Sequence, residues 1–359
     1  MIRKIHLYSI KNMLHIDNLK KTLKVINNYR VRGLHDSFQV SIYYKKNKIN
    51  ISGGKALSDS KLRWFSSGKP ITALAIAKLV EKKLLNYEEY ISRFLPKFEG
   101  SKKNITVLNV LNHTIGLSDA ENANQLHSEK EIMEYICDSA QLSGWVNGRR
   151  AAYQPTAGWH ILKNIIEVIT NEKYNDYLTD NILNPLGMNG TKTFGTPDII
   201  TMNTQKIPHQ ESYPRIPRNF PKPGSSFIGP SRDLLKIYEM LLNKGIYNNI
   251  RILRETTVNE LISSQRGIIY DETFQYPMDW GLGVMINKSE NKLNMPYGYG
   301  KFASELSFGH GGIQSSVGFA DPKYQLAIVI ILDGQPGEAL HNRRIRNIIE
   351  SIYQELGIT

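Results

Sequence analysis

Strand-like runs lie near both ends of this 359-residue chain, and helical patterns fill its middle. Runs at 38–44 and 49–52, joined by a polar turn at 45–48, predict a hairpin near the N-terminus. Three further strand-like runs lie near the other end, at 281–287, 316–320 and 325–332. Because a sheet must bury an apolar face against other elements, we expect one sheet built from the two ends of the chain, with a helical subdomain inserted between its halves.

Helical periodicity accounts for most of the remaining segments. Helices are predicted at 17–32, 70–85, 105–113, 129–138, 158–170, 174–186, 231–243 and 342–356. The first half of 70–85 is apolar around almost its whole circumference, so this helix is expected to begin buried. Seven prolines between positions 197 and 230 disfavour helix and inner strand alike, so a long loop is predicted there. Ser231 is expected to cap the helix that follows.

No internal repeat and no flexible linker divides the chain. We therefore expect a single catalytic unit over 1–359, made of two subdomains. The α/β subdomain is expected at about 1–64 and 224–359, and the helical subdomain, with the proline-rich loop, at about 65–223.

The charge pattern and the apolar runs exclude several classes of protein. The net charge is +12, but Lys and Arg are spread along the chain without a nucleic-acid-binding motif, so no nucleic-acid partner is expected. No run approaches the roughly 20 apolar residues of a membrane span, and the first 21 residues lack the apolar core of a signal peptide, so we expect a cytoplasmic protein. The single Cys137 cannot form an internal disulfide, and no His, Asp or Glu cluster has metal-ligand spacing, so neither metal nor cofactor is expected.

The pattern Ser-x-x-Lys places a hydroxyl and an amine on one face of a helix, and it occurs four times, at 52/55, 58/61, 66/69 and 289/292. Three copies lie in turns or solvated segments, and only Ser66 opens a buried helix. Free N–H groups and the helix dipole there favour the negative charge that develops in acyl transfer. Partial desolvation of Lys69 among apolar neighbours would favour its neutral amine. At this point a helix cap at Ser66 and a surface role for Lys69 stay open as alternatives.

Three blocks follow one another in an order that is typical of one family. They are RWFSSGKPITALAIAKLVEKKLL at 63–85, VLNHTIGL at 110–117 and FGHGGIQSSVGFADP at 308–322. With SRDLLKIYEMLLNKG at 231–245, they resemble the serine β-lactamase-related family of class C β-lactamases, D-aminopeptidases and esterases. The likeness runs from about residue 35 onward. It implies an α/β (α+β) fold of the β-lactamase/transpeptidase type, with an antiparallel sheet formed by both chain ends, flanking helices and an inserted all-helical subdomain.

The third motif of that family lies on an edge strand beside the nucleophile, and here it reads His310-Gly311-Gly312. Since glycine has no Cβ, Gly311 and Gly312 would let a substrate approach the strand closely. The resemblance implies that the N–H of Ile313 joins that of Ser66 as the oxyanion hole. It also implies that His310 lines the site and polarises either the substrate or a nearby tyrosine.

The second motif of the family is Tyr-x-Asn, and the matching segment here is AAYQPTAGWHILKNIIE at 151–167. Tyr153 is therefore the candidate that exchanges protons with the nucleophile, provided that nearby positive charge, which Lys69 could supply, stabilises its phenolate. The sequence departs from the pattern at Pro155, which stands where Asn is expected and carries no side-chain amide. Thr156 is expected to substitute for it in part, and the departure bears on the substrate more than on nucleophilic catalysis.

These residues predict a serine hydrolase that acts on a small-molecule ester or amide through an acyl-enzyme on Ser66. The residues expected to bind substrate are Gly311, Gly312, Thr156 and Trp280. His113 is expected to be structural, and Trp159 is expected to lie in the core or in the wall of the pocket. A cytosolic acyltransferase that passes the acyl group to an amine or alcohol acceptor is one alternative. A catalytically silent, penicillin-binding-like protein is the other, although a silent protein has no chemical need for the serine, lysine, tyrosine and His-Gly-Gly together.

Overall fold

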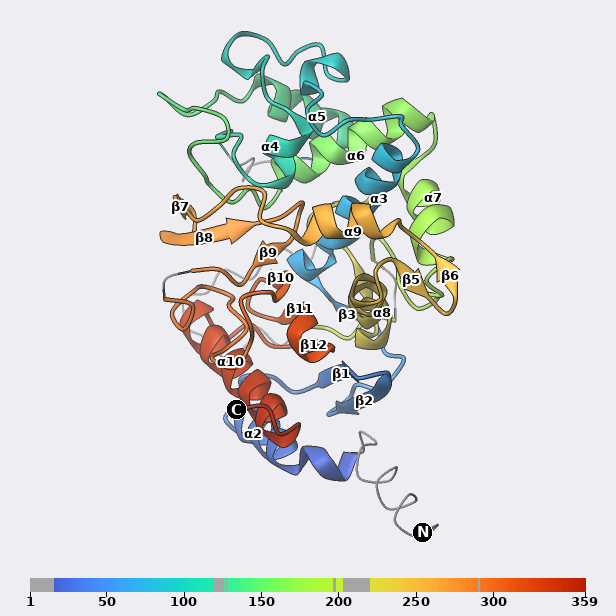
Figure 1. Ribbon diagram of the computed structural model, residues 1–359, viewed down its shortest axis with the longest axis vertical. Helices are drawn as coiled ribbons and strands as arrows, with labels where there is room; N and C mark the ends of the chain where they lie inside the picture. Colours follow the sequence, from blue (N-terminus) through green and yellow to red (C-terminus); the bar gives the residue numbers. More distant parts are fainter. Residues whose placement is uncertain (1–15, 119–125, 127, 196–197, 203–219, 290) are drawn as a thin grey trace.

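An eight-stranded antiparallel sheet forms the centre of the structure (Figure 1), a computed structural model that describes residues 16–118, 126, 128–195, 198–202, 220–289 and 291–359. The strand order is β2-β1-β12-β11-β10-β9-β8-β7. The bounds are β1 (Phe38–Tyr44), β2 (Asn47–Gly53), β7 (Ile269–Asp271), β8 (Tyr276–Trp280), β9 (Met285–Ile286), β10 (Phe308–Gly312), β11 (Ser316–Asp321) and β12 (Leu326–Leu332). The prediction of one antiparallel sheet with strands from both ends of the chain is confirmed.

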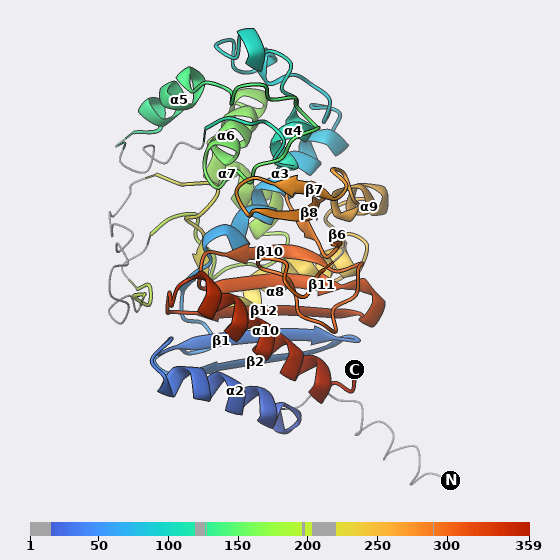
Figure 2. The ribbon, with the colours of Figure 1, turned by 90° about the vertical axis from the view of Figure 1, so that its left-hand side faces the viewer.

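Strand β12 lies in the middle of the sheet, and its sequence LAIVIIL is apolar because both of its faces are covered. It pairs with β1 along the full length of both strands, from Phe38 opposite Leu332 to Tyr44 opposite Leu326. Helix α8 (Ser231–Leu242) packs on one face of the sheet. Helices α2 (Lys20–Val31) and α10 (Glu338–Glu355), which contact each other, cover the other face (Figure 2).

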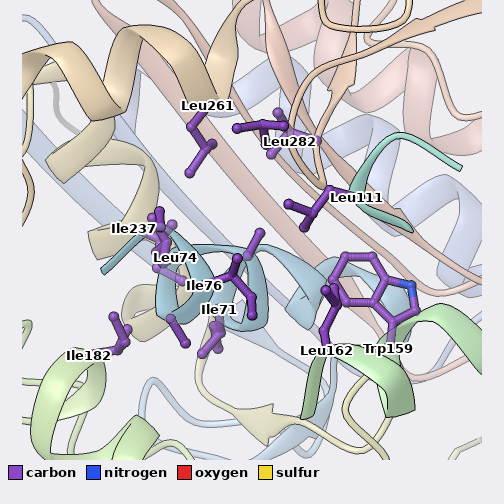
Figure 3. Close-up of a cluster of buried hydrophobic side chains, with 14 of the residues drawn as sticks. Ile71, Leu74, Ile76, Leu111, Trp159, Leu162, Ile182, Ile237, Leu261 and Leu282 are labelled. Atoms are coloured by element: carbon purple, nitrogen blue, oxygen red, sulfur yellow. The ribbon is translucent and has the colours of Figure 1, made fainter. Parts of the chain in front are cut away.

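The remaining helices gather beyond one edge of the sheet, around α3 (Lys69–Glu81) (Figures 1 and 3). Ile71, Leu74 and Ile76 of α3 are fully buried, so the prediction that this helix begins buried is confirmed. They lie among Leu162, Ile182 and other apolar side chains of the surrounding elements. These elements are α4 (Val107–Leu111), α5 (Glu129–Asp138), α6 (Ala157–Thr170), α7 (Tyr174–Leu178), the π-helical turn η6 (Thr179–Leu183) and α9 (Glu255–Ile262).

Short elements complete the described chain. Single 3₁₀ turns are η1 (Ile16–Leu19), η2 (Phe65–Gly68), η3 (Ile91–Arg93), η4 (Gly100–Lys102) and η7 (Pro322–Tyr324). Two small antiparallel pairs join β3 (Leu62–Arg63) to β4 (Ile228–Gly229) and β5 (Ile246–Tyr247) to β6 (Ile250–Arg251). Among the helices described, none combines the length and the apolar character needed to cross a membrane.

Several predicted boundaries are wrong. The hairpin turn is Lys45-Lys46 alone, with φ of 47° and 71°, because a two-residue turn with both residues left-handed matches the twist of the strands. Of the run predicted at 281–287, only β9 is strand, since the N–H of Gly281 donates to Val284 O at 2.9 Å and closes a tight turn between β8 and β9. Ser231 does not cap α8, because its Oγ lies 2.7 Å from Ser41 Oγ of the sheet.

The proline-rich loop predicted at 197–230 falls partly outside the described residues, at 197 and at 203–219. Its described end contains β4, so that part is a short strand rather than loop. The His-Gly-Gly strand β10 is also not an edge strand as expected, because it lies between β11 and β9, and the edges are β2 and β7. The subdomain boundaries near 64 and 224 stay a prediction.

Candidate active site

Ser66 lies on the 3₁₀ turn η2, one turn before α3, rather than on α3 itself. The preceding residue, Phe65, is left-handed with φ of 49°, an uncommon conformation for a bulky residue. Trp64, the residue before Phe65, fixes this turn through hydrogen bonds of its main chain and its indole ring. Its N–H donates to Phe227 O at 3.0 Å, its Nε1 donates to Gly229 O at 2.8 Å, and its carbonyl accepts from Ser316 Oγ at 2.6 Å. The turn presents a half-buried Ser66 beside the sheet.

Lys69 and Tyr153 both contact the hydroxyl of Ser66. The Nζ of Lys69 donates to Ser66 Oγ at 2.8 Å, and the Tyr153 hydroxyl donates to the same oxygen at 3.1 Å. Lys69 is fully buried, and its Nζ lies 5.5 Å from the centre of the Tyr153 ring. The surface role for Lys69 is therefore excluded, and Ser66 is not the cap of α3, which is Gly68.

Gly224 supplies an acceptor for Lys69 that sequence reasoning missed. Lys69 Nζ donates to Gly224 O at 2.6 Å, and a Cβ on Gly224 would lie 2.6 Å from Pro155 O. The missed group is a main-chain carbonyl, which any residue type can provide. The only feature of the sequence that marks this position is a glycine that follows Pro221 and Pro223 and precedes two serines.

The segment that carries Tyr153 is supported by His113. The carbonyl of His113 accepts from Ala152 N at 3.1 Å, and its Nδ1 accepts from Gln154 N at 3.2 Å. Burial, followed by the charge of Arg266, lowers the pKa of His113 well below its ordinary value, so the ring stays neutral and Nδ1 can accept. These contacts agree with the structural role expected for His113.

His310 faces the same cluster from β10. Its ring lies 5.9 Å from that of Tyr153, and its Nδ1 lies 2.7 Å from Gly311 O. Burial and the charge of Lys69 lower the pKa of His310 to about 3, so the ring is neutral near pH 7. Since Gly311 O can only accept, Nδ1 carries the proton and Nε2 is left as an acceptor.

Packing alone requires the two glycines of this motif. A Cβ on Gly311 would lie 2.3 Å from the ring of Tyr297, and one on Gly312 would lie 2.2 Å from Trp64 O. The close approach of a substrate to these glycines stays a prediction.

The two N–H groups expected to form the oxyanion hole lie on linked elements. Ser67 Oγ donates to His310 O at 3.1 Å and lies 2.9 Å from Ser316 Oγ, which ties the Ser66 turn to β10 and β11. Within the described part of the chain, the N–H groups of Ser66 and Ile313 meet no hydrogen-bond acceptor. Their joint role stays a prediction.

The other predicted binding residues lie behind or beside the cluster. Trp280 is only 1% exposed and stacks on Tyr153 with ring centres 5.6 Å apart, so it supports the site from behind, and direct contact with substrate stays a prediction. Thr156 precedes α6 and its carbonyl accepts from Trp159 N at 3.2 Å. Trp159 is buried as expected. A group of His, Cys, Asp or Glu able to hold a metal ion is not found among the described residues.

Comparisons with known proteins identify the family and the fold of the chain. A family model named Beta-lactamase matches residues 37–351. Esterase/beta-lactamase LipL of Mycobacterium tuberculosis is 22% identical over 332 residues, which are 81% of this chain and 71% of LipL. A penicillin-binding protein homologue from Caulobacter crescentus has a TM-score of 0.77 at 18% identity, covering 94% of this chain and 98% of its own. EstCE1, a hydrolase with promiscuous acyltransferase activity, has a TM-score of 0.77 at 17% identity, covering 94% and 99%. The two structural likenesses show the fold alone.

Proposed function

The chain belongs to the beta-lactamase family, and from that premise we propose that it is a serine hydrolase whose Ser66 attacks the carbonyl of an ester or amide. The observation that carries the proposal is the contact of Ser66 Oγ with both Lys69 Nζ, at 2.8 Å, and Tyr153 OH, at 3.1 Å. A serine hydroxyl becomes an effective nucleophile when a basic group lies within hydrogen-bond distance.

The reaction has two halves. In the first, Ser66 Oγ bonds to the carbonyl carbon while its proton passes to the basic form of Lys69 or Tyr153. The carbonyl oxygen then carries a negative charge that the N–H groups of Ser66 and Ile313 are proposed to stabilise. The bond to the leaving group breaks, the leaving group takes up the proton, and an acyl-enzyme remains on Ser66. In the second half, water attacks the acyl carbon and gives up a proton to the basic group. The bond from the acyl carbon to Ser66 Oγ then breaks, the acid leaves, and Oγ takes up the proton, which restores the free serine.

The rings beside Ser66 support an apolar substrate. The Tyr153 ring lies 4.9 Å from that of Phe274, which lies 6.1 Å from that of Tyr297. Phe274 and Tyr297 are half-buried, so they present apolar surface at the site. With the neutral His310, they favour a small ester without a charge close to the reacting bond.

Acyl transfer is the second candidate. It is supported by the fold that this chain shares with EstCE1, a hydrolase with promiscuous acyltransferase activity. An acyl-enzyme on Ser66 would serve both reactions, which differ only in whether water or an amine or alcohol attacks it. Adding benzylamine to an ester assay distinguishes them, because transfer yields the amide whereas hydrolysis yields only the acid.

A fluorophosphonate probe tests the proposal, because it forms a covalent bond only with an activated serine. Ser66→Ala should abolish labelling, whereas Ser67→Ala, the matched control one residue further on, should keep it. Ser67 Oγ is buried between His310 O and Ser316 Oγ, so its loss should lower stability by about 1 kcal/mol without removing the nucleophile. Labelling that survives Ser66→Ala would refute the proposal.

A further inference from the structure

The carboxylate of Asp271, the last residue of β7, is fully buried beside the segment that carries Tyr153. Its Oδ1 accepts three main-chain N–H groups, from Tyr153 at 3.0 Å, Thr273 at 3.1 Å and Phe274 at 3.2 Å. The Thr273 hydroxyl in turn donates to Tyr153 O at 3.0 Å. Both main-chain polar groups of Tyr153 are thus held by the turn that follows β7.

Arg266 joins this turn to the other support of Tyr153. Its NH1 donates to Asp271 Oδ2 at 3.1 Å and to Asn112 O at 3.2 Å, and its side chain is as fully buried as that of Asp271. Asn112 precedes His113, which binds the main chain on both sides of Tyr153. The ion pair therefore links the two groups of contacts that hold the main chain of Tyr153, one from the turn after β7 and one from His113.

Arg266 also reaches the ring of Tyr153 through Trp280. Its guanidinium carbon lies 5.9 Å from the centre of the Trp280 ring, which stacks on Tyr153 at an interplanar angle of 25°. Tyr153 itself lies in an irregular segment of the chain, outside the helices and strands. Its phenol therefore depends on these outside contacts for its orientation.

We propose that the buried Asp271–Arg266 pair is a positioning device that keeps the Tyr153 hydroxyl within hydrogen-bond distance of Ser66. The proposal rests on the proposed function, in which Tyr153 moves a proton to or from Ser66. Asp271 holds the main chain of Tyr153, and Arg266 holds both Asp271 and the ring on which Tyr153 stacks. Neither residue contacts Ser66, so both act through Tyr153.

The test compares two variants with a matched control. Asp271→Asn keeps the size and one acceptor oxygen but removes the charge that faces Arg266. Thr273→Val, at an exposed position, removes only the hydroxyl bond to Tyr153 and leaves the ion pair in place. Asp321→Asn is the control, because Asp321 is equally buried and accepts from Ser304 N, Ser304 Oγ and Tyr353 OH, away from Ser66.

Steady-state kinetics with p-nitrophenyl acetate should show whether displacing the Tyr153 hydroxyl slows the reaction. Asp271→Asn should lower kcat by about 10- to 10²-fold, the range for a displacement of about 1 Å, with little change in KM. Thr273→Val should give a smaller loss in the same direction, and Asp321→Asn should keep wild-type kcat per folded molecule. In a Tyr153→Phe background the effect of Asp271→Asn should shrink to within about threefold, because the group that it positions is gone. An equal loss in both backgrounds would overturn the proposal.

A second readout does not depend on hydrolase activity. In protein that contains 3-fluorotyrosine, the ¹⁹F NMR signal of residue 153 is identified as the one missing from Tyr153→Phe. Asp271→Asn and Thr273→Val should shift that signal, and Asp321→Asn should not. An unmoved signal in the first two variants would overturn the positioning role even if kcat fell. A shifted signal in a protein whose wild type hydrolyses no ester would instead refute the proposed function and leave the positioning role standing.

Discussion

Replacing Gly224 by alanine should slow the reaction, because the added methyl group would displace the main chain that holds Lys69. The new Cβ would lie 2.6 Å from Pro155 O and 3.1 Å from Lys69 Nζ. Real Cβ atoms essentially never approach other atoms closer than 3.0 Å, so Gly224 and Pro155 must separate by at least 0.4 Å, the difference between the two distances. Gly224 O, which accepts from Lys69 Nζ at 2.6 Å, would move with its residue.

The displacement should lower kcat by about 10- to 10²-fold, because displacements of this order carry such losses at catalytic groups. Crowding should also destabilise the fold by about 1–3 kcal/mol. Gly224 is not left-handed, so the loss would come from contact rather than from backbone strain. The assays are steady-state hydrolysis of p-nitrophenyl acetate, the rate of fluorophosphonate labelling and thermal unfolding.

Gly195→Ala is the matched control, since no atom of the residues that the structure describes lies within 4 Å of a Cβ at Gly195. It should leave both kcat and the melting temperature unchanged. If Gly224→Ala stayed folded and kept kcat within about twofold of wild type, far below the expected loss, then Lys69 would not depend on this carbonyl and the reasoning would be refuted.

Three further predictions concern the proton carriers, the substrate and a buried histidine. Lys69→Ala and Tyr153→Phe should each lower kcat by about 10²–10⁴-fold in ester hydrolysis, and a Tyr153→Phe enzyme within about threefold of wild type would assign the base role elsewhere. Nitrocefin should be a poor substrate compared with p-nitrophenyl acetate. Pro155 offers no side-chain amide to a polar substrate arm, and the missing hydrogen bond costs about 1–3 kcal/mol of binding free energy. A kcat/KM for nitrocefin near 10⁶ M⁻¹s⁻¹, about the middle of the range for enzymes, would contradict this prediction. Burial, followed by the charges of Arg344 and Arg30, lowers the pKa of His35 to about 3. The unfolded chain therefore binds more protons than the folded one between about pH 6.5 and 3. As a result, the free energy of unfolding should fall as pH falls through this window. In urea unfolding, His35→Leu should remove about 2 kcal/mol of the fall in unfolding free energy between pH 7 and pH 5, while other buried histidines such as His113 and His310 still contribute in the same direction. The same pH dependence in both proteins would contradict the assignment.

Local signals could be predicted well where a residue interacts with its own neighbours in the chain. Helix α5 begins and ends where its periodicity indicates, because Ser128 and Glu131 form a capping box within four residues. Ser66 and Lys69 are three positions apart on consecutive turns, so their contact also follows from the sequence alone. The contact of Tyr153 with Ser66 is long-range, and it was expected only through the resemblance to a family.

Other features could not be predicted because the deciding partner lies far away in the chain. Ser231 has the residue type of a helix cap, but Ser41 of a distant strand takes its hydroxyl. Gly312 is required by packing as well, because the carbonyl of Trp64, a residue far away in the chain, lies where a Cβ would be. Gly224 O serves Lys69 as a main-chain acceptor, and main-chain acceptors leave no mark in a pattern of residue types.

The pairing of β1 with β12 has a consequence for how the molecule is made. These strands lie far apart in the chain, so β1 must wait until the ribosome has synthesised and released β12 before the two can pair. Closing so long a loop is entropically costly and slows folding relative to proteins with local contacts. Until it pairs, the uncharged run LAIVIIL of β12 has the composition of an aggregating segment, and β1 and β11 are the strands that cover its edges. We therefore expect chains that lack β1 to accumulate as aggregates rather than as folded protein of lower activity.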